Sequence, residues 1–282
     1  MRLEHVTALD LARPEMGPYA TLRQHDEHKR AGLFVAEGDK VVRLLLDSAF
    51  GVVSVLLPEK RRAEFEPLIR ARPEDVTLFV MEIAELEKLT GFPFFQGVLA
   101  VGKIPQPATL DSILATTPRP HLFVAGDGLA NSENIGLIVR NCVAFGVQAL
   151  IVDGSSASPF LRRSVRNSMG TILKLPVVET ENLVGALHAL RARGVRVLAA
   201  HPHTEERTIA DTDFTVDCCL VLGSEGKGLS AEVLAACDEA VAIPMYAEVD
   251  SLNVGSAAAV FLYEAMRQRG LRSERRGAAI AP

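Results

Sequence analysis

The residues best suited to chemistry lie in three glycine-bearing segments in the second half of this 282-residue chain, each following a run of apolar residues. In the first segment, GDGLANSENIGLIVRN, the residues Asn134, Gly136 and Arg140 form an Asn-x-Gly-x-x-x-Arg pattern. Gly136 and Arg140 are four residues apart, so they share one face of the predicted helix, where the glycine leaves room for a close approach. An ordinary helix with an exposed arginine explains this spacing equally well.

The second segment, LGSEGKGLS at residues 222–230, is similar to a phosphate-binding loop but fails its pattern. A phosphate loop needs a glycine four residues ahead of the Gly-Lys pair and a serine or threonine after the lysine. Val221 and Gly228 occupy those two positions here. What remains is a flexible loop whose one acid, Glu225, can accept hydrogen bonds from a ligand. A turn with a solvated carboxylate is the simpler interpretation of the loop alone.

The third segment, IPMYAEVDSLNVGSAAAVFLYE, places Ser251 and Asn253 just before or at the start of a predicted helix. Either residue can cap that helix through its side-chain oxygen. A loop of exposed backbone amides leading into a helix also suits a polar or anionic ligand. Capping alone accounts for both residues when this segment is considered by itself.

Metal and nucleophile chemistry find little support in the sequence. The pairs His201-Pro-His203 and His25-x-x-His28 lack cysteine or carboxylate partners at a recognised metal-ligand spacing, so we predict no metal site. No GxSxG nucleophile motif occurs. The four cysteines form no CxxC pair, which favours reduced thiols and a cytoplasmic location.

Composition and charge exclude several classes of protein. The chain is 48% hydrophobic and 23% charged, as expected for a globular protein rather than a disordered or fibrous one. We predict no membrane-spanning segment and no secretory signal. The net charge of −5 gives no overall attraction to nucleic acid, so RNA binding would need local basic patches. Arg162, Arg163 and Arg166 form one such patch, and the C-terminal arginines form another.

The predicted elements divide the chain into two α/β regions. Residues 1–18 are predicted to be an extension, 19–104 a small α/β domain, and 105–120 a proline-rich linker. Residues 121–270 form the second α/β domain, and 271–282 a disordered tail. The second domain alternates apolar strands, at residues 121–126, 149–154, 195–200, 218–223 and 239–245, with helices at residues 133–146, 182–194 and 253–269. Such apolar runs predict a parallel sheet buried on both faces, whose ligands bind beyond the carboxyl ends of the strands.

Taken together and in order, the three segments resemble the SpoU/TrmH family of RNA 2′-O-ribose methyltransferases within the SPOUT superfamily. The resemblance rests on Asn134-Ile-Gly-x-x-x-Arg140, then on Leu222-Gly-Ser-Glu225-Gly-x-Gly228, and then on Ile243-Pro-Met245 followed by Ser251-Leu-Asn-Val254. The segments LFVAEGDKVVRLLL and FQGVLA also resemble the ribosomal-protein-like substrate-binding domain that precedes the catalytic domain in many members.

This resemblance implies a fold, a cofactor and an assembly. The fold is a SPOUT domain with a parallel sheet and a deep trefoil knot, preceded by the smaller α/β RNA-binding domain. The cofactor is S-adenosylmethionine, and the assembly is a homodimer whose active site draws on both subunits. The substrate is RNA, with ribosomal RNA favoured over transfer RNA by analogy with family members that carry a helper domain.

The resemblance also assigns roles to residues. The catalytic and substrate-side set is Asn134, Arg140, Glu225, Ser251 and Asn253. The cofactor-binding set is Leu222, Gly223, Gly228, Ile243, Met245, Leu252 and Val254. It favours RNA contact for Arg162, Arg163 and Arg166 over simple solvation.

Two departures and two alternatives remain. Gly255 stands where the family often has serine, and Glu133 stands where it often has proline. A catalytically silent RNA-binding module of the same fold is one alternative, although the intact motif residues argue against it. An enzyme acting on a small nucleotide through the LGSEGKG loop is the other, and the failed phosphate-loop pattern counts against it.

Overall fold

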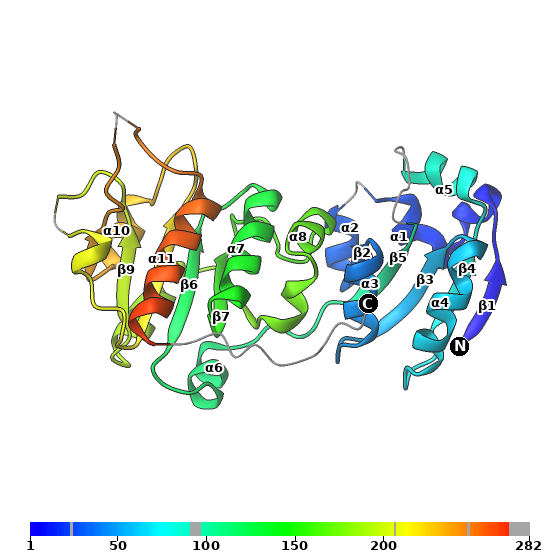
Figure 1. The fold of residues 1–282 in the computed structure, drawn as a ribbon, viewed down its shortest axis with the longest axis horizontal. Coiled ribbons are helices and arrows are strands. Elements are labelled where there is room, and N and C mark those ends of the chain that lie inside the picture. Colours follow the sequence, from blue (N-terminus) through cyan, green and yellow to red (C-terminus); the bar gives the residue numbers. More distant parts are fainter. Residues whose placement is uncertain (23–24, 91–96, 206, 247–248, 271–282) are drawn as a thin grey trace.

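The computed structural model describes residues 1–22, 25–90, 97–205, 207–246 and 249–270, arranged as two lobes side by side (Figure 1). Each lobe has its own β-sheet, and helix α8 (Arg162–Asn167) lies between them. The predicted disordered tail, residues 271–282, falls outside the described residues.

The N-terminal lobe is built on a five-stranded mixed sheet in the order β1-β4-β3-β5-β2. Its strands are β1 (Arg2–His5), β2 (Leu33–Glu37), β3 (Val52–Leu57), β4 (Thr77–Val80) and β5 (Leu99–Lys103). Its helices are α1 (Gly17–Ala20), α2 (His25–Arg30), α3 (Asp39–Leu46), α4 (Glu59–Arg70) and α5 (Ile83–Thr90). Short 3-10 turns at Ala8–Ala12 and Pro14–Met16 precede α1. Apolar side chains at helical spacing, such as Val41, Val42 and Leu45 of α3, are buried against this sheet.

The first eighteen residues differ from the predicted extension, because they belong to the N-terminal lobe. Strand β1 pairs in parallel with β4, and Arg2 donates its backbone N–H to Val76. Met16 and Tyr19 are completely buried beside the face of the sheet that carries Phe79. A four-residue edge strand shows no sequence periodicity, since its position is set by its pairing with β4.

The predicted linker also contains structure. Helix α6 (Leu110–Thr116) forms between its two pairs of prolines, and Thr109 caps it by accepting a hydrogen bond from the Ser112 N–H at 3.1 Å. Ile113 is buried among the apolar residues of the second lobe. The linker therefore joins the lobes while its helix covers part of the second sheet.

The second lobe confirms the predicted α/β fold with a parallel sheet. Six strands run in the order β11-β9-β10-β6-β7-β8, and every neighbouring pair is parallel. The strands are β6 (Leu122–Asp127), β7 (Ala149–Asp153), β8 (Val177–Thr180), β9 (Arg196–Ala200), β10 (Cys218–Gly223) and β11 (Glu239–Val241). The 3-10 turns Thr171–Lys174 and Ile209–Asp211 lie in its connections.

Helices cover both faces of this sheet. Apolar side chains of α7 (Ser132–Ala144) and α11 (Val254–Gln268) pack on one face, beside strand residues such as Leu220. Side chains of α9 (Leu183–Arg191) and α10 (Ala231–Ala236) pack on the other, beside Val221. The alternation of buried faces explains the continuous apolar runs in the sequence. Among the described residues, no helix is long and apolar enough to cross a membrane.

The two lobes share one apolar core. The rings of Phe34, Phe50 and Phe160 meet between them, with centroid separations of 5.6 to 6.2 Å. Beside these rings, Glu37 of β2 forms ion pairs with Arg162 and with Arg166 of α8. The side chains of Glu37 and Arg162 are each only 10% exposed, so this connection lies inside the molecule.

Candidate active site

A cavity of about 340 Å³ opens at the carboxyl ends of β9, β10 and β11. Its walls come from the three loops that follow these strands and from the first turns of α11. In open parallel sheets this edge is where ligands bind, and the volume lies within the range of pockets for small molecules. The second and third motif segments of the sequence meet here.

The cavity rim carries a hydrogen-bonded cluster of Asn134, Glu225 and Asn253. The Asn134 side-chain amide donates to Oε1 of Glu225, and the Asn253 amide donates to the same oxygen at 2.8 Å. Asn253 also donates to Oδ1 of Asn134 at 3.1 Å. Asn134 is buried, whereas Glu225 faces solvent. One residue from each motif segment thus contributes to the cluster, although they lie up to 119 positions apart.

Asn253 has a second role as the N-cap of α11. Its Oδ1 accepts hydrogen bonds from the backbone N–H groups of Gly255 at 2.9 Å and Ser256 at 3.3 Å. Capping satisfies two of the free amides at the helix start. The same side chain therefore uses its oxygen for the helix and its amide for Glu225, so capping and site functions are combined. Ser251, the other candidate cap, lines the cavity instead.

The loop after β10 folds back on itself through its glycines. Ser224 and Gly228 exchange backbone hydrogen bonds of 3.0 and 2.8 Å. Gly223 packs so closely on the backbone of Gly228 that a Cβ atom at Gly223 has no room. Gly228 itself has a φ of +65°, which favours glycine. The loop is tied to the end of β6, because Ser230 N–H donates to Asp127 at 2.7 Å.

All of the residues predicted to bind the cofactor line the cavity, and so do Glu225 and Ser251. The predicted cofactor residues are Leu222, Gly223, Gly228, Ile243, Met245, Leu252 and Val254. Their contact with a cofactor stays a prediction.

Arg140 is not brought to the cluster within one chain. It lies six residues after Asn134 on α7, a rise of about 9 Å, and on another face of the helix. Its side chain is exposed, and among the described residues no hydrogen bond or ion pair holds it. Gly136 does leave room for a close approach, as its spacing predicts, and the element that approaches is α8. A Cβ at Gly136 would lie 2.6 Å from the Cβ of Asn167.

The predicted RNA-binding arginines of α8 divide into two kinds. Arg162 is buried against Glu37, and Arg166 contacts the same carboxylate at 3.2 Å. Arg163 is exposed. For Arg162 an ion pair between the lobes therefore takes the place of the predicted RNA contact. Glu37 lies 125 positions away in the chain, so no local pattern indicated this partner.

Sequence reasoning missed one wall of the cavity. His201, Pro202 and His203 follow β9 and line the cavity, as do Ala257 and Phe261 of α11. The His201-Pro-His203 spacing suggests only a metal site, whereas in the structure both residues line the cavity. Among the described residues no group of three or more His, Cys, Asp or Glu side chains could hold a metal ion. Their place directly after a predicted parallel strand was the available signal.

Comparison with known proteins gives concordant matches. The sequence pattern of the SpoU rRNA methylase family matches residues 121–263. An uncharacterised tRNA/rRNA methyltransferase of Mycobacterium tuberculosis is 31% identical over 257 residues, which are 87% of this chain and 84% of that protein.

Solved structures match the whole fold. The SpoU methyltransferase AviRb from Streptomyces viridochromogenes, in complex with AdoMet, is 30% identical with a TM-score of 0.78. The match covers 91% of this chain and 98% of AviRb. An RNA 2′-O ribose methyltransferase is 26% identical with a TM-score of 0.75, over 95% of this chain and all of that one (100%).

Proposed function

The chain belongs to the SpoU rRNA methylase family, and from this premise we propose that it methylates a ribose 2′-hydroxyl of ribosomal RNA. Its cofactor is S-adenosylmethionine, and its substrate is RNA. The observation that carries the proposal is the Asn134–Glu225–Asn253 cluster, which places one residue from each motif at the rim of the cofactor cavity. The match to an RNA 2′-O ribose methyltransferase supports the choice of the 2′-hydroxyl.

The cavity suits S-adenosylmethionine. Gly223 and Gly228 bring backbone to its wall, where amide and carbonyl groups can bind the polar parts of the cofactor. Ile243, Val254 and Phe261 supply apolar surface for a flat ring. When bound, the cofactor supplies a methyl group on a sulfonium, which is already activated for transfer.

The protein then has to position the ribose and help to remove its proton. Glu225, held by two asparagine amides, and Ser251 at the cavity wall can orient the ribose hydroxyls. A guanidinium carries five N–H donors and no acceptor, so Arg140 does not serve as the base that takes the hydroxyl proton. We assign Arg140 to binding the nucleotide phosphate and to stabilising the developing alkoxide charge.

A homodimer would complete this site. Arg140 lies away from the cluster of its own chain, so a second copy has to supply it. The helix that carries it also exposes Leu137 (41%), and the neighbouring α11 exposes Val260 (39%) and Tyr263 (54%). Exposed apolar side chains on two helices that pack together favour burial against another chain. Both helices lie together on one face of the lobe (Figure 1).

Two further elements of the proposal concern the fold and the substrate. We propose that the segments around β10 and α11 are threaded as a deep trefoil knot, as in the family. We assign the N-terminal lobe to RNA binding as a ribosomal-protein-like domain, with Arg163 contributing from α8.

Methyl transfer from radiolabelled S-adenosylmethionine tests the function. The RNA comes from cells that lack the gene, is separated by size after reaction, and is hydrolysed with alkali. Label in ribosomal RNA that survives as alkali-stable dinucleotides supports 2′-O-methylation, whereas label in mononucleotides refutes it. Label confined to transfer RNA overturns the substrate assignment. No label despite cofactor binding by calorimetry favours the silent RNA-binding module.

Arginine variants test the role of Arg140 in the same assay. Arg140→Ala should abolish transfer, and Arg140→Lys should lose most of it, because lysine lacks the planar fork that binds phosphate at two points. Arg193→Ala is the matched control, since Arg193 is another exposed arginine whose partner, Asp111, lies outside the cavity. Near-normal turnover of Arg140→Lys would contradict the assigned role.

A further inference from the structure

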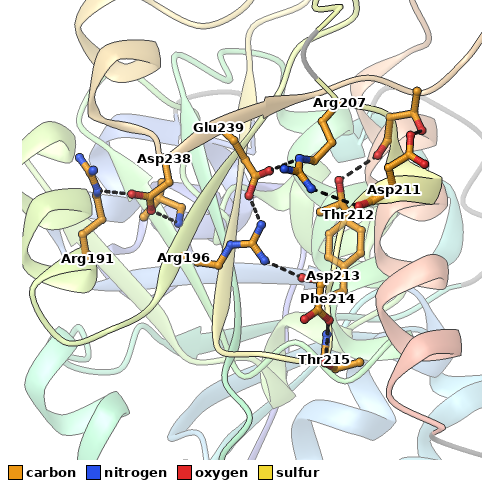
Figure 2. Close-up of polar contacts among 12 residues, drawn as sticks. Arg191, Arg196, Arg207, Asp211, Thr212, Asp213, Phe214, Thr215, Asp238 and Glu239 are labelled. Atoms are coloured by element: carbon orange, nitrogen blue, oxygen red, sulfur yellow. Dashed lines mark hydrogen bonds and ion pairs between the residues drawn. The ribbon is translucent and has the colours of Figure 1, made fainter.

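A charged network ties the loop after β9 to strand β11 (Figure 2). Arg207 forms an ion pair with Oε2 of Glu239 at 2.7 Å, and Arg196 forms an ion pair with the other carboxylate oxygen of Glu239. Arg196 also donates to the backbone carbonyl of Asp213 at 3.0 Å. The Glu239 side chain is only 15% exposed, so its two arginines shield it from solvent.

Backbone hydrogen bonds place the same loop against β11. His201 N–H donates to Val241 at 3.0 Å at the start of the loop. At its end, Ala242 N–H donates to the backbone carbonyl of Arg207 at 2.9 Å, and Thr208 forms a parallel β-bridge with Ala242. The loop is therefore fixed at both ends to β11, and the Arg207–Glu239 ion pair adds a side-chain attachment.

Between those two anchors the loop forms one wall of the cofactor cavity. His201, Pro202 and His203 line the cavity together with the glycine loop after β10. The histidine rings stand 6.1 Å apart, and His203 N–H donates to Nδ1 of His201 at 3.2 Å. His203 stands only four residues before Arg207 in the chain, so we expect the anchor at Arg207 to limit how far this wall can move.

We propose that the Arg207–Glu239 ion pair is a latch that holds the histidine wall in position for S-adenosylmethionine before the cofactor binds. Arg207 and Glu239 are then positioning residues: they act through the wall. An isolated exposed ion pair contributes little to stability. A loop that must become ordered on binding lowers affinity, however, and fixing it beforehand restores that affinity. The inference rests on the cofactor and not on which RNA is methylated.

Calorimetric titration of the full-length protein with S-adenosylmethionine tests the latch without any RNA. Arg207→Met keeps the alkyl stem and removes the charge, and we expect it to raise the Kd by about three- to tenfold, since 1.4 kcal/mol corresponds to a factor of ten. Glu239→Gln should have a similar effect. Arg207→Lys keeps the charge and should recover most of the affinity.

Arg191→Met is the matched control. Arg191 forms a 2.7 Å ion pair with Asp238 close to the latch (Figure 2), and this pair joins α9 to the residue just before β11 rather than to the loop after β9. Melting curves without cofactor establish that each variant is folded. The latch is refuted if Arg207→Met binds as tightly as the wild-type protein, or if Arg191→Met loses as much affinity as Arg207→Met. Failure of wild-type protein to bind S-adenosylmethionine would instead overturn the cofactor itself.

Discussion

Gly223 is the position where the smallest possible side chain should do the most damage. In Gly223→Ala the added Cβ would lie 2.5 Å from the carbonyl oxygen of Gly228, and closer still to its carbonyl carbon and to the amide nitrogen of Leu229. These atoms are backbone, so the methyl group cannot be accommodated by turning a side chain. The β10 strand and its loop must move apart.

The expected cost follows from overpacking, which destabilises by about 1–3 kcal/mol. For a lobe of this size each kcal/mol lowers the Tm by about 2–4 °C, so we expect a fall of about 2–12 °C. The displaced backbone also lines the cavity. If the same energy is lost from binding, the Kd for S-adenosylmethionine rises by at least about fivefold.

The same loop contains a control for this prediction. At Gly226 an added Cβ meets nothing within 4 Å, so the free energy of unfolding of Gly226→Ala should lie within about 0.5 kcal/mol of the wild-type value. Thermal unfolding without cofactor compares the two variants, and calorimetry measures binding by Gly223→Ala. A Gly223→Ala protein with unchanged Tm and Kd would show that the close approach does not exist in solution.

Three other predictions follow from the hydrogen bonds and pKa shifts. Asn253→Asp should keep the α11 cap but place a second carboxylate beside Glu225, so it should lose methyl transfer with little change in the urea unfolding midpoint. Asn253→Ala should lose both methyl transfer and about 1 kcal/mol of the free energy of unfolding, because the cap is gone. Equal unfolding midpoints for the two variants would contradict this. Hydrogen bonds from Arg72 hold the pKa of Glu74 at about 2, below its usual 4.5. Because the folded pKa is the lower one, this stabilisation is complete above about pH 5 and is lost as the pH falls towards 2, so urea midpoints of Glu74→Gln should decline less steeply there than those of wild type. Burial raises the pKa of the Cys237 thiol to about 12, and the other three thiols are buried with raised pKa values. A thiol reagent at pH 8 should therefore label none of the four until urea is added. Rapid labelling of the native protein would be inconsistent with this packing.

The sequence predicted five of the six strands of the second lobe because their signals are local, but it missed β8 and the short helices α8 and α10. Apolar runs such as residues 218–223 are long enough to identify strands, and their order predicted the edge at which the motif loops meet. The resemblance to the family assigned Glu225 and Asn253 to one site, and in the structure the Asn253 amide donates a 2.8 Å hydrogen bond to Glu225. The resemblance to the family was confirmed by the match over residues 121–263.

The features that escaped prediction depend on contacts between distant segments. Strand β1 exists because β4 lies beside it, and nothing within residues 2–5 indicates that pairing. Arg162 looks like a surface cation in sequence, since its partner Glu37 is 125 positions away. The histidine wall has no motif of its own, and it becomes part of the site only when the β9 loop is fixed to β11.

Gly136 of α7 allows α8, the helix between the lobes, to pack closely on the helix that carries the first motif. Ser164 of α8 places its carbonyl oxygen 2.7 Å from where a Cβ of Gly136 would stand, so α8 packs directly on the helix that carries Asn134. The opposite side of α8 is joined to β2 through the buried Arg162–Glu37 pair. Independent motion of two domains is the usual expectation only where their interface is small and polar. Here an apolar cluster runs through the interface into both cores, beside the Arg162–Glu37 pair, so we expect the lobes to move as one unit. On the proposed assignment of the N-terminal lobe to RNA binding, this spacing determines which nucleotide of a bound RNA reaches the cofactor cavity.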